Sequence, residues 1–251
     1  MKQRKKDQCF MIKAVIFDMF ETLITHYESP LYMGRQIAAD IGIAENKFRE
    51  IWNTSEEDRT LGKKTLEDVI EEVLRVNELY SKELFDKIIQ KRILSKRECF
   101  AHIHPEIIPL LKELKARKIK IGLISNCYSE ECDVIKDSIL FEYFDSACMS
   151  FELGMKKPDV RIFEKCMKDL DVLPEECIYV GVGGSRELET ARELGMNPIQ
   201  AVWYLKEEIP QLEKRKPEFA QAESPFNILY FKESPPWDRS CIYLLYQSMI
   251  N

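Results

Sequence analysis

A short apolar run that ends in an acid is the feature that most constrains the fold of this chain. Residues 14–17 are Ala-Val-Ile-Phe, and Asp18 follows them directly. Such a run predicts a strand buried on both faces of a parallel sheet, and open sheets of this kind bind ligands beyond the carboxyl ends of their strands. Asp18 is therefore predicted to lie at a binding edge, where a carboxylate can serve as a covalent nucleophile. The alternative role for a single Asp after a strand is a turn or a helix cap.

Downstream of residue 105 the chain alternates between amphipathic and short apolar segments. The amphipathic segments predict helices over 106–117, 130–138, 160–169 and 187–194. The apolar segments predict strands over 119–124, 147–151, 177–182, 199–203 and 228–231. Because a helix between two consecutive strands makes those strands parallel, the pattern predicts an α/β fold, in which a doubly wound, Rossmannoid parallel sheet carries helices on both faces.

Four amphipathic segments separate the first strand from the second, which is too many for a single crossover connection. They predict helices over 31–41, 48–55, 66–76 and 82–94. We therefore expect an inserted α-helical cap domain over 27–100 that covers the strand ends as a lid. A separate bundle without a catalytic role is the alternative. The remaining parts are then an N-terminal extension (1–10), the core (11–26 and 101–232) and a C-terminal tail (233–251).

Three later segments place polar residues after or between apolar runs. The second strand ends in Ser125-Asn126, Lys157-Pro158 follows, and residues 179–196 read YVGVGGSRELETARELGM. In this order and spacing, these segments and the first strand resemble the motifs of the haloacid dehalogenase-like (HAD) hydrolase superfamily, over residues 12–203. The resemblance implies a cap of the C1 type and assigns the first three motif residues to Asp18, Ser125 and Lys157. Lys157 is chosen over its neighbouring lysine because the lysine of the family directly precedes a proline.

The residue types at these positions are suited to phosphoryl transfer. We expect Asp18 and Lys157 to be the catalytic residues, because a carboxylate and a phosphate approach each other in a partly dry site only if a cation offsets their charges. Substrate contacts are predicted for Thr22, for the hydroxyl of Ser125 and for Asn126, whose backbone would bind phosphoryl oxygens. Outside this context, Ser125-Asn126 would indicate a turn, and Lys157 an exposed loop lysine.

Two positions depart from the pattern of the family's phosphatases. Phe20 stands two residues after the nucleophile, where those enzymes have an aspartate that protonates the leaving group. Val182 stands where metal-dependent members have an aspartate that binds magnesium. Glu21 is expected to point away from the site if the backbone there is extended. The remaining candidate ligands of Mg²⁺ are Asp18, the backbone carbonyl of Phe20 and, weakly, Glu187, so that weak binding or none is expected.

Bulk composition excludes several classes of function. With 37 basic and 43 acidic side chains the net charge is −6, so nucleic acid is not expected as a partner. No segment approaches the roughly 20 apolar residues of a membrane span, and the N-terminus lacks the apolar region of a signal peptide. The eight cysteines show no CxxC spacing, which favours reduced thiols. We therefore expect a cytoplasmic protein, with a charged helix over 206–216 and an apolar segment, 241–250, that docks on the core.

Three other candidate sites have less support. Cys127 is a potential nucleophile beside Ser125-Asn126, but none of the three histidines has an obvious pairing with it. His102 and His104 are spaced as a pair of metal ligands, and no third ligand is apparent nearby. Residues 183–185, Gly-Gly-Ser at the start of a helix, would offer backbone N–H groups to an anion.

Three hypotheses of function follow. The first is a HAD-type hydrolase that acts on a small phosphorylated metabolite through an aspartyl-phosphate on Asp18, with activity reduced by Phe20 and Val182. The second is a catalytically inactive binding protein of the same fold, which the loss of both acids would permit. The third is a metal-independent hydrolase similar to the 2-haloacid dehalogenases, because those relatives also carry an aromatic residue at the position of Phe20, although their fourth motif is not reproduced here.

Overall fold

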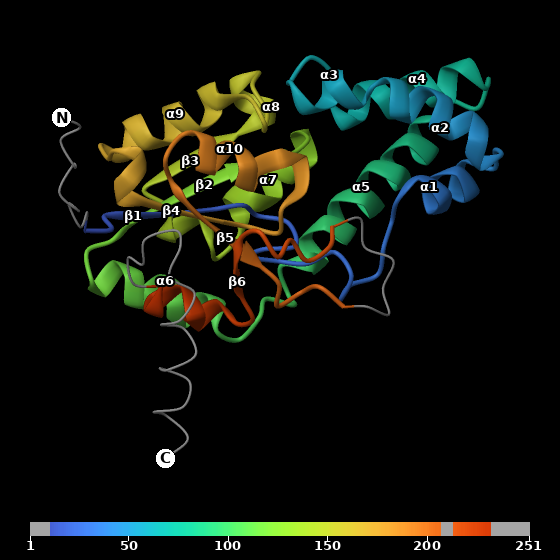
Figure 1. Cartoon of the computed structure of the whole chain (residues 1–251). Helices are drawn as coiled ribbons and strands as arrows, with labels where there is room; N and C mark the ends of the chain where they lie inside the picture. The colour runs from blue at the N-terminus through green and yellow to red at the C-terminus, as the bar shows by residue number, and fades with distance from the viewer. Residues whose placement is uncertain (1–10, 207–212, 232–251) are drawn as a thin grey trace.

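A six-stranded parallel sheet forms the centre of the computed structural model, which describes residues 11–206 and 213–231 (Figure 1). Its strands lie in the order β3-β2-β1-β4-β5-β6. Their bounds are Ala14–Phe17 (β1), Lys120–Ser125 (β2), Ser146–Met149 (β3), Cys177–Gly181 (β4), Asn197–Ala201 (β5) and Ala220–Ala222 (β6). The predicted α/β class and the doubly wound parallel sheet are therefore confirmed.

Helices cover both faces of the sheet, since successive strand residues point to opposite sides. Val15 and Phe17 belong to the apolar core formed with α6 and α7, whereas Ala14 and Ile16 belong to the core formed with α9 and α10. Every position of β1 is consequently buried and apolar. The helices of the core are α6 (Ile107–Ala116), α7 (Ser129–Asp137), α8 (Ser150–Leu153), α9 (Val160–Leu170) and α10 (Glu187–Glu193), with short 3₁₀ helices η1 (Phe141–Tyr143), η2 (Pro174–Glu176), η3 (Gly184–Arg186) and η4 (Pro225–Tyr230).

The strand order reverses at β1. Phe17 is aligned with Leu123 of β2 on one side and with Val180 of β4 on the other. The chain runs from β1 to β2 and β3 at one edge of the sheet and then crosses over β1 to β4. In doubly wound sheets the ligand crevice opens at such a reversal, beyond the carboxyl ends of the strands. The topology therefore places Asp18, the first residue after β1, at this crevice.

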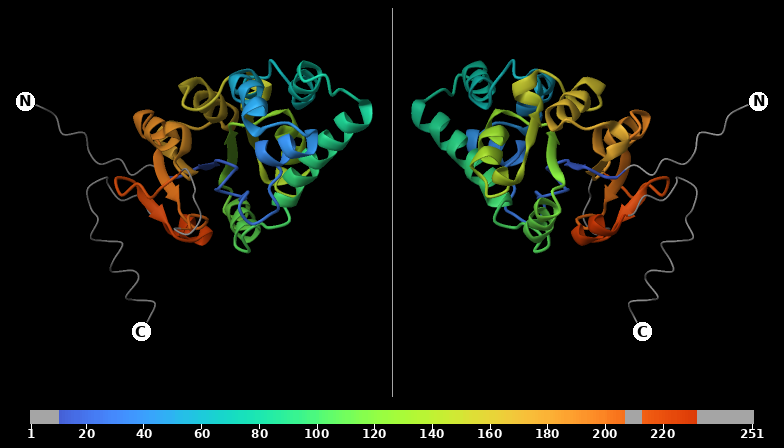
Figure 2. Two further views of the ribbon diagram at one scale, coloured as in Figure 1. Left: turned by 90° about the vertical axis from the view of Figure 1, so that its right-hand side faces the viewer. Right: turned by 90° about the vertical axis from the view of Figure 1, so that its left-hand side faces the viewer.

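Five helices between β1 and α6 form a unit that we call the helical insertion. They are α1 (Gly34–Ile41), α2 (Glu45–Thr54), α3 (Glu56–Thr60), α4 (Leu66–Val76) and α5 (Lys82–Cys99). The unit has an apolar core of its own, which buries Phe48, Ile70, Val73 and Ile88. It projects from one side of the α/β core (Figure 1), with α4 and α5 far from β6 (Figure 2). The division of the chain at residues 27 and 100 stays a prediction.

The prediction of a last strand over 228–231 is wrong. These residues belong mostly to η4, and the sixth strand is β6. Ser224 followed by Pro225 starts a helical turn, since proline suits the first helical position, and Ile228 is then buried against the core without pairing as a strand. The helical insertion also contains α3, a five-residue helix that is too short to show a periodic pattern.

Several expectations concern residues outside the described part of the chain. These are the extension over 1–10, the docking of 241–250 and most of the charged helix over 206–216, of which the described residues 213–216 are not helical. Within 11–206 and 213–231, no helix combines the length and the apolar character that crossing a bilayer requires.

Candidate active site

Three hydrogen-bond partners, Val180, Lys157 and Thr22, fix Asp18 at the end of β1. Its backbone N–H donates to the carbonyl of Val180, 2.8 Å away, which continues the pairing of β1 with β4. One carboxylate oxygen, Oδ1, lies 2.5 Å from Lys157 Nζ, and the other accepts a longer hydrogen bond of 3.4 Å from Thr22 Oγ1. Asp18 is only 7% exposed, so the protein, not solvent, determines the charge balance around it.

Lys157 lies between two carboxylates. Its Nζ is 2.5 Å from Asp18 Oδ1 and 2.5 Å from Glu187 Oε2, and it also donates to the hydroxyl of Tyr179 at 3.3 Å. All three charged side chains are at least nine-tenths buried, and together they carry one excess negative charge. The ammonium therefore offsets the charges of Asp18 and Glu187 only in part.

Glu187 is fixed by the protein on both of its carboxylate oxygens. Oε1 accepts from the backbone N–H of Gly183 at 2.9 Å, and Oε2 accepts from Tyr179 Oη at 2.9 Å as well as from Lys157. Gly181 leaves the space for this carboxylate, because a Cβ atom there would lie 2.3 Å from Oε1. The motifs did not point to Tyr179. The one indication in the sequence is that it is the single tyrosine in an otherwise apolar buried strand.

Burial dominates the electrostatics of Asp18. It raises the pKa of this carboxyl to about 7, Lys157 lowers the pKa, and the nearby Glu187 raises it again. Burial lowers the pKa of Lys157, but the two ion pairs raise it by more. Asp18 and Glu187 therefore hold the pKa of Lys157 above its usual range. In the free protein, Asp18 therefore changes charge near neutral pH while Lys157 stays protonated.

We expect kcat/KM for an aryl phosphate to rise about tenfold between pH 6 and pH 8, because Asp18, the predicted nucleophile, would attack only in its ionised form and its pKa lies at about 7. The substrate also titrates near pH 6, so the Glu187→Gln variant is the control. Its neutral amide removes a charge that raises the pKa of Asp18, and the acidic limb should move to lower pH. A profile that is flat from pH 6 to pH 8, or an unmoved limb in the variant, would contradict this assignment.

The predicted substrate-binding residues lie near Asp18 in different ways. Ser125, at the end of β2, is completely buried, and its hydroxyl has no hydrogen-bond partner among the described residues. Asn126 holds the backbone of Lys157: its Oδ1 accepts from the lysine N–H at 2.8 Å, and its Nδ2 donates to the lysine carbonyl at 3.1 Å. Thr22 is also fully buried, and it accepts from the N–H of Val182 at 3.1 Å.

The position two residues after Asp18 is closed by aromatic packing. The ring of Phe20 stacks on His26 with 4.6 Å between centroids. Glu21 has a left-handed backbone, with φ of 57°, instead of the extended one assumed from the sequence. Its carboxylate accepts from the hydroxyl of Thr25 at 2.5 Å and from the backbone N–H of His26 at 2.9 Å. Neither Phe20 nor Glu21 is therefore placed as a free proton donor.

The donors at this edge fit a magnesium ion only in part. Asp18 supplies one carboxylate, Val182 supplies none, and both oxygens of Glu187 are engaged within the protein. Among the residues that the structure describes, no group of three or more His, Cys, Asp or Glu side chains is placed to hold a metal. Mg²⁺ is commonly held by one or two carboxylates together with water and substrate phosphate. The described side chains by themselves therefore supply only part of a magnesium shell.

The remaining candidates from the sequence have ordinary structural surroundings. Cys127 is buried, its Sγ lies 3.3 Å from that of Cys132, and this contact and burial raise its pKa well above the usual range, so it is a poor nucleophile. His104 Nδ1 accepts from a backbone N–H, and His102 is exposed. The hydroxyl of Ser185 accepts a hydrogen bond of 3.3 Å from the side-chain amide of Asn126, the residue that also binds the backbone of Lys157.

Buried ion pairs connect the helical insertion to the core beside this edge. Lys96 of α5 lies 2.6 Å from Glu131 of α7, and its Nζ is 2.8 Å from the ring nitrogen Nε2 of His26. Arg92 of α5 lies 3.0 Å from Glu130. Removing one member of such a pair would leave a buried charge uncompensated, which costs several kcal/mol. These contacts therefore fix α5 against α7.

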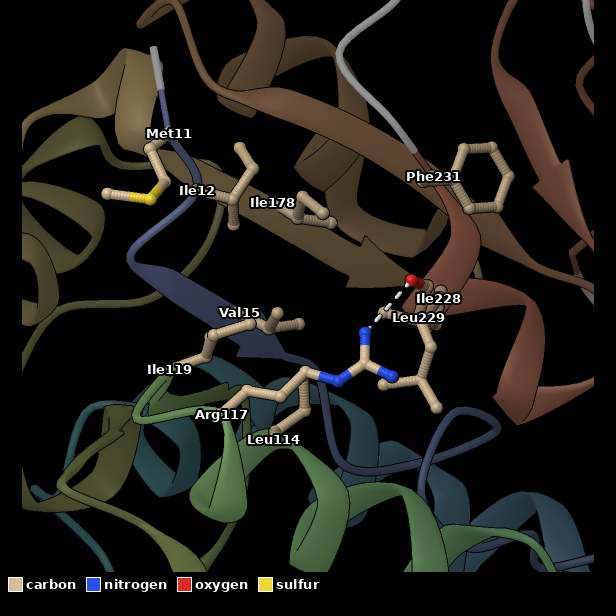
Figure 3. A pocket seen from close by; sticks show the side chains of 10 residues that line it. All are labelled: Met11, Ile12, Val15, Leu114, Arg117, Ile119, Ile178, Ile228, Leu229 and Phe231. Atoms are coloured by element: carbon tan, nitrogen blue, oxygen red, sulfur yellow. Dashed lines mark hydrogen bonds between the residues drawn. The ribbon is translucent and has the colours of Figure 1, made fainter.

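A separate cavity of about 400 Å³ lies at the other end of the strands (Figure 3). Its lining is mostly aliphatic, with Ile12, Ile119 and Ile178 among the residues, and Arg117 donates across it to the carbonyl of Leu229 at 3.4 Å. The lining includes no carboxylate, thiol or imidazole. This cavity therefore offers no side chain of the kinds that serve as nucleophile or general base.

The parallel core, its reversal at β1 and the buried carboxylate–lysine pair at that point define a Rossmannoid hydrolase core. A family model described as haloacid dehalogenase-like hydrolase matches residues 12–195. The chain belongs to the haloacid dehalogenase-like hydrolase family, so the predicted family is confirmed, whereas the C1 type of its cap and the roles of the motif residues stay predictions.

Comparisons with individual proteins agree with this family. A glyceraldehyde 3-phosphate phosphatase of Methanocaldococcus jannaschii is 26% identical over 200 residues, which cover 76% of this chain and 85% of that protein. The rhythmically expressed gene 2 protein of Drosophila melanogaster is 37% identical over 89 residues, and the match spans only 34% of each chain.

Solved structures show the same fold. A 2-haloacid dehalogenase of Pseudomonas syringae superposes with a TM-score of 0.63 at 21% identity, over 88% of this chain and 97% of that one. A HAD family enzyme of Bacteroides thetaiotaomicron, in complex with magnesium and inorganic phosphate, superposes with a TM-score of 0.59 at 20% identity, over 76% and 94% of the two chains.

Proposed function

We propose that this protein is a phosphatase that hydrolyses a small phosphorylated metabolite through an aspartyl-phosphate on Asp18. The observation that carries the proposal is the buried Asp18–Lys157 pair at the reversal of the sheet, together with the unpartnered hydroxyl of Ser125 at the end of the neighbouring strand β2. A nucleophile, a cation and a free donor are the parts that phosphoryl transfer needs. The relative named glyceraldehyde 3-phosphate phosphatase supports the choice of substrate class.

The proposed reaction has two steps. In the first, a carboxylate oxygen of Asp18 attacks phosphorus, a P–O bond forms, and the ester P–O bond breaks with its electron pair leaving on the alcohol oxygen. In the second, water attacks the phosphorus of the acyl phosphate, which releases inorganic phosphate and regenerates the carboxylate. Lys157 offsets the added negative charge in both steps, the Ser125 hydroxyl donates to a phosphoryl oxygen, and Thr22 holds the second oxygen of Asp18 in place.

The closed position at Phe20 has a consequence for substrate preference. General acid catalysis contributes typically about 10²–10⁴-fold, and Phe20 has no proton to supply. Among the described neighbours of Phe20, the carboxylate of Glu21 is engaged by Thr25 and His26, and the ring nitrogens of His26 contact Glu21 and Lys96. Without a proton donor, the rate at which the alcohol leaves the ester depends on the acidity of that alcohol. The proposed enzyme should therefore favour esters of acidic alcohols, such as aryl or acyl phosphates, over esters of simple alcohols.

We also propose that magnesium binds weakly and chiefly together with a phosphorylated ligand. Asp18 and the backbone carbonyl of Phe20 would hold it, since Glu187 is already engaged by Lys157 and Gly183. The bound ion would supply positive charge next to the phosphate. Magnesium in the related Bacteroides structure supports this part of the proposal.

Restoring the missing acid should strengthen the metal site. Val182 is buried at the end of β4, the neighbour of β1, so that Val182→Asp would add a carboxylate near Asp18. We expect the concentration of Mg²⁺ at half-maximal activity to fall at least about tenfold, the effect of about 1.4 kcal/mol of added binding. The Val182→Asn variant, which has the same shape without the charge, is the control. An equal response to both substitutions would mean that this position does not face the metal.

The cap and the cellular location complete the proposal. The helical insertion would act as the cap, held over the strand ends by the Lys96–Glu131 and Arg92–Glu130 pairs. The six described cysteines are all free, which supports a reducing compartment such as the cytoplasm.

Release of phosphate from p-nitrophenyl phosphate and a panel of phosphate esters, with and without Mg²⁺, tests the function. Turnover with at least one ester is expected. A protein that binds phosphate esters yet hydrolyses none would instead support the inactive binding protein, which Phe20 and Val182 favour. Release of chloride from 2-chloropropionate without metal would support the dehalogenase hypothesis.

A further inference from the structure

The aliphatic cavity at the amino ends of the strands lies beside both ends of the described chain. Met11 is the first described residue and Phe231 the last, and both line the cavity (Figure 3). The lining residues Ile12, Ile119 and Ile178 lie within two residues of the starts of β1, β2 and β4. The cavity is therefore at the opposite end of these strands from the candidate active site.

The apolar lining is only partly covered by the described residues. Met11 is 74% exposed. Ile12, Ile119, Leu229 and Phe231 pack against the apolar core but are each only partly buried. Because removing apolar surface from water is favourable, a contiguous lining of this kind is suited to an apolar occupant.

The cavity has room for more than one side chain. Its volume is about 400 Å³. An engineered apolar cavity of about 150 Å³ takes one benzene-sized molecule, so this cavity would take about two or three side chains. One side chain would leave most of the space empty, whereas an apolar segment of several residues would fill it.

The charged group at the cavity is already engaged by the protein. Arg117 is the one charged residue among the described residues of the lining, and the others are apolar. Its Nε donates to Glu113 Oε1 at 2.8 Å, and its Nη1 donates to the carbonyl of Leu229 at 3.4 Å. Pockets for small molecules usually present a few polar groups that fix the orientation of the ligand. This lining therefore favours an uncharged apolar segment of polypeptide over a polar metabolite.

Two segments continue the chain from the cavity, and one of them suits it. Residues 1–10 read MKQRKKDQCF, with four basic side chains and one acid. Residues 241–250 read CIYLLYQSMI, without a charged side chain, in a chain of which 32% of the residues are charged. Burying the first segment beside Arg117 would take several cations out of water without partners, which is costly. The second segment brings only apolar and uncharged polar side chains.

The connection to residues 241–250 is long enough for them to return to the cavity. Phe231 lines the cavity, and nine residues, 232–240, separate it from Cys241. An extended chain covers at most about 3.3–3.6 Å per residue, so this connection spans up to about 30 Å. A loop of this length is short, and the entropic cost of closing it is correspondingly small.

We infer that residues 241–250 bind in the apolar cavity of the same molecule, over the starts of β1, β2 and β4. The segment would cover the side chains of Met11, Ile119 and Phe231 and would close the apolar core at the end opposite to Asp18. It would contribute to stability and not to the chemistry at Asp18, so the inference is independent of the proposed function.

The test introduces two charges into the segment within the full chain. The double variant Leu244→Asp/Leu245→Asp should lower the melting temperature by about 3–8 °C, because carboxylates are not buried against an aliphatic lining. The matched control is Ser234→Asp/Ser240→Asp, which adds the same charges to the connection and should shift the melting temperature by less than about 2 °C. Equal losses in the two double variants would overturn the inference.

Hydrogen exchange of the wild-type chain gives a readout that needs no variant. The amides of residues 241–250 should exchange at least about tenfold more slowly than those of a free peptide of this sequence. In the Leu244→Asp/Leu245→Asp chain, the lining segments 114–119 and 226–231 should exchange faster, and residues 125–128 at the far end of β2 should not change. Exchange of 241–250 at the rate of the free peptide would overturn the inference.

Two further measurements identify the occupant. Light scattering should give the same mass for the wild type and for the Leu244→Asp/Leu245→Asp chain. A dimer that this substitution dissociates would mean that the segment occupies the cavity of a second copy, which would overturn binding within one molecule. The fluorescence of the apolar dye ANS should increase in the double variant, because the cavity is then open. Equal dye fluorescence of the two chains would contradict the inference.

Discussion

Replacing Asp18 by Asn is expected to lower kcat for p-nitrophenyl phosphate at least about 10³-fold, the scale seen when a covalent nucleophile is removed. The amide has nearly the same shape but cannot form the acyl phosphate. Little change in stability is expected, because burial already raises the pKa of Asp18 to about 7 and makes its ionised form unfavourable in the folded protein. Steady-state phosphate release and thermal unfolding at pH 8 measure the two effects.

The Asp137→Asn variant is the control, since Asp137 is an exposed aspartate at the end of α7 and should behave as wild type. Full activity of the Asp18→Asn variant would remove Asp18 from the chemistry. Mass spectrometry of the wild-type protein trapped during turnover adds a direct readout, because an aspartyl-phosphate adds one phosphoryl group to the peptide that contains Asp18.

Replacing Lys157 by Met is expected to lower both activity and stability. The substitution leaves Asp18 and Glu187 as two buried carboxylates without their shared cation. Breaking a buried ion pair in this way costs about 3–5 kcal/mol of unfolding free energy. Activity should fall at least about 10³-fold, since nothing then offsets the charge of Asp18 and phosphate together.

The loss of stability in Lys157→Met should depend on pH with a definite sign. Without the lysine, the pKa of Asp18 rises further above that of the unfolded chain, so the folded protein binds more protons than the unfolded chain does. Stability is then retained at low pH and lost as the pH increases through the raised pKa of Asp18. The variant should therefore be closer to wild type at pH 5 than at pH 8, as measured by urea unfolding.

Lys156→Met is the matched control for this prediction. Lys156 is the neighbouring residue, but it is partly exposed and its ion pair with Glu57 lies at the surface. Exposed pairs contribute about 0–1 kcal/mol, so this variant should unfold nearly as wild type does and keep its activity. Equal effects of the two substitutions would contradict the distinct role assigned to Lys157.

Local sequence patterns were enough to predict the fold class and the candidate residues. The apolar strands, the alternation of strand and helix and the acid after β1 are short-range features, and the family match confirms the superfamily that they resemble. The same patterns failed over residues 228–231, because an apolar segment can be buried as a helical turn as well as in a strand. Periodicity does not distinguish these two outcomes.

Most contacts between distant parts of the chain were beyond local patterns. The family resemblance placed Lys157 with Asp18 across 139 residues, but it did not show that Glu187, considered from the sequence only as a weak metal ligand, is engaged by that lysine, by Tyr179 and by Gly183. Its two oxygens are therefore not free to act as the sequence suggested. Which partner a buried charge takes depends on which side chains the fold brings within about 3 Å, and no local pattern records that.

The sequence by itself determined the order of the first five strands and of the longer helices, the acid after the first strand and the non-acidic residues at Phe20 and Val182. Only the tertiary structure decided the charge balance of the site and the position of the apolar cavity at the other end of the strands. The physical reason is one of range. Backbone preference and apolar periodicity act between neighbouring residues, whereas burial, charge pairing and unsatisfied donors arise only when remote segments are packed together.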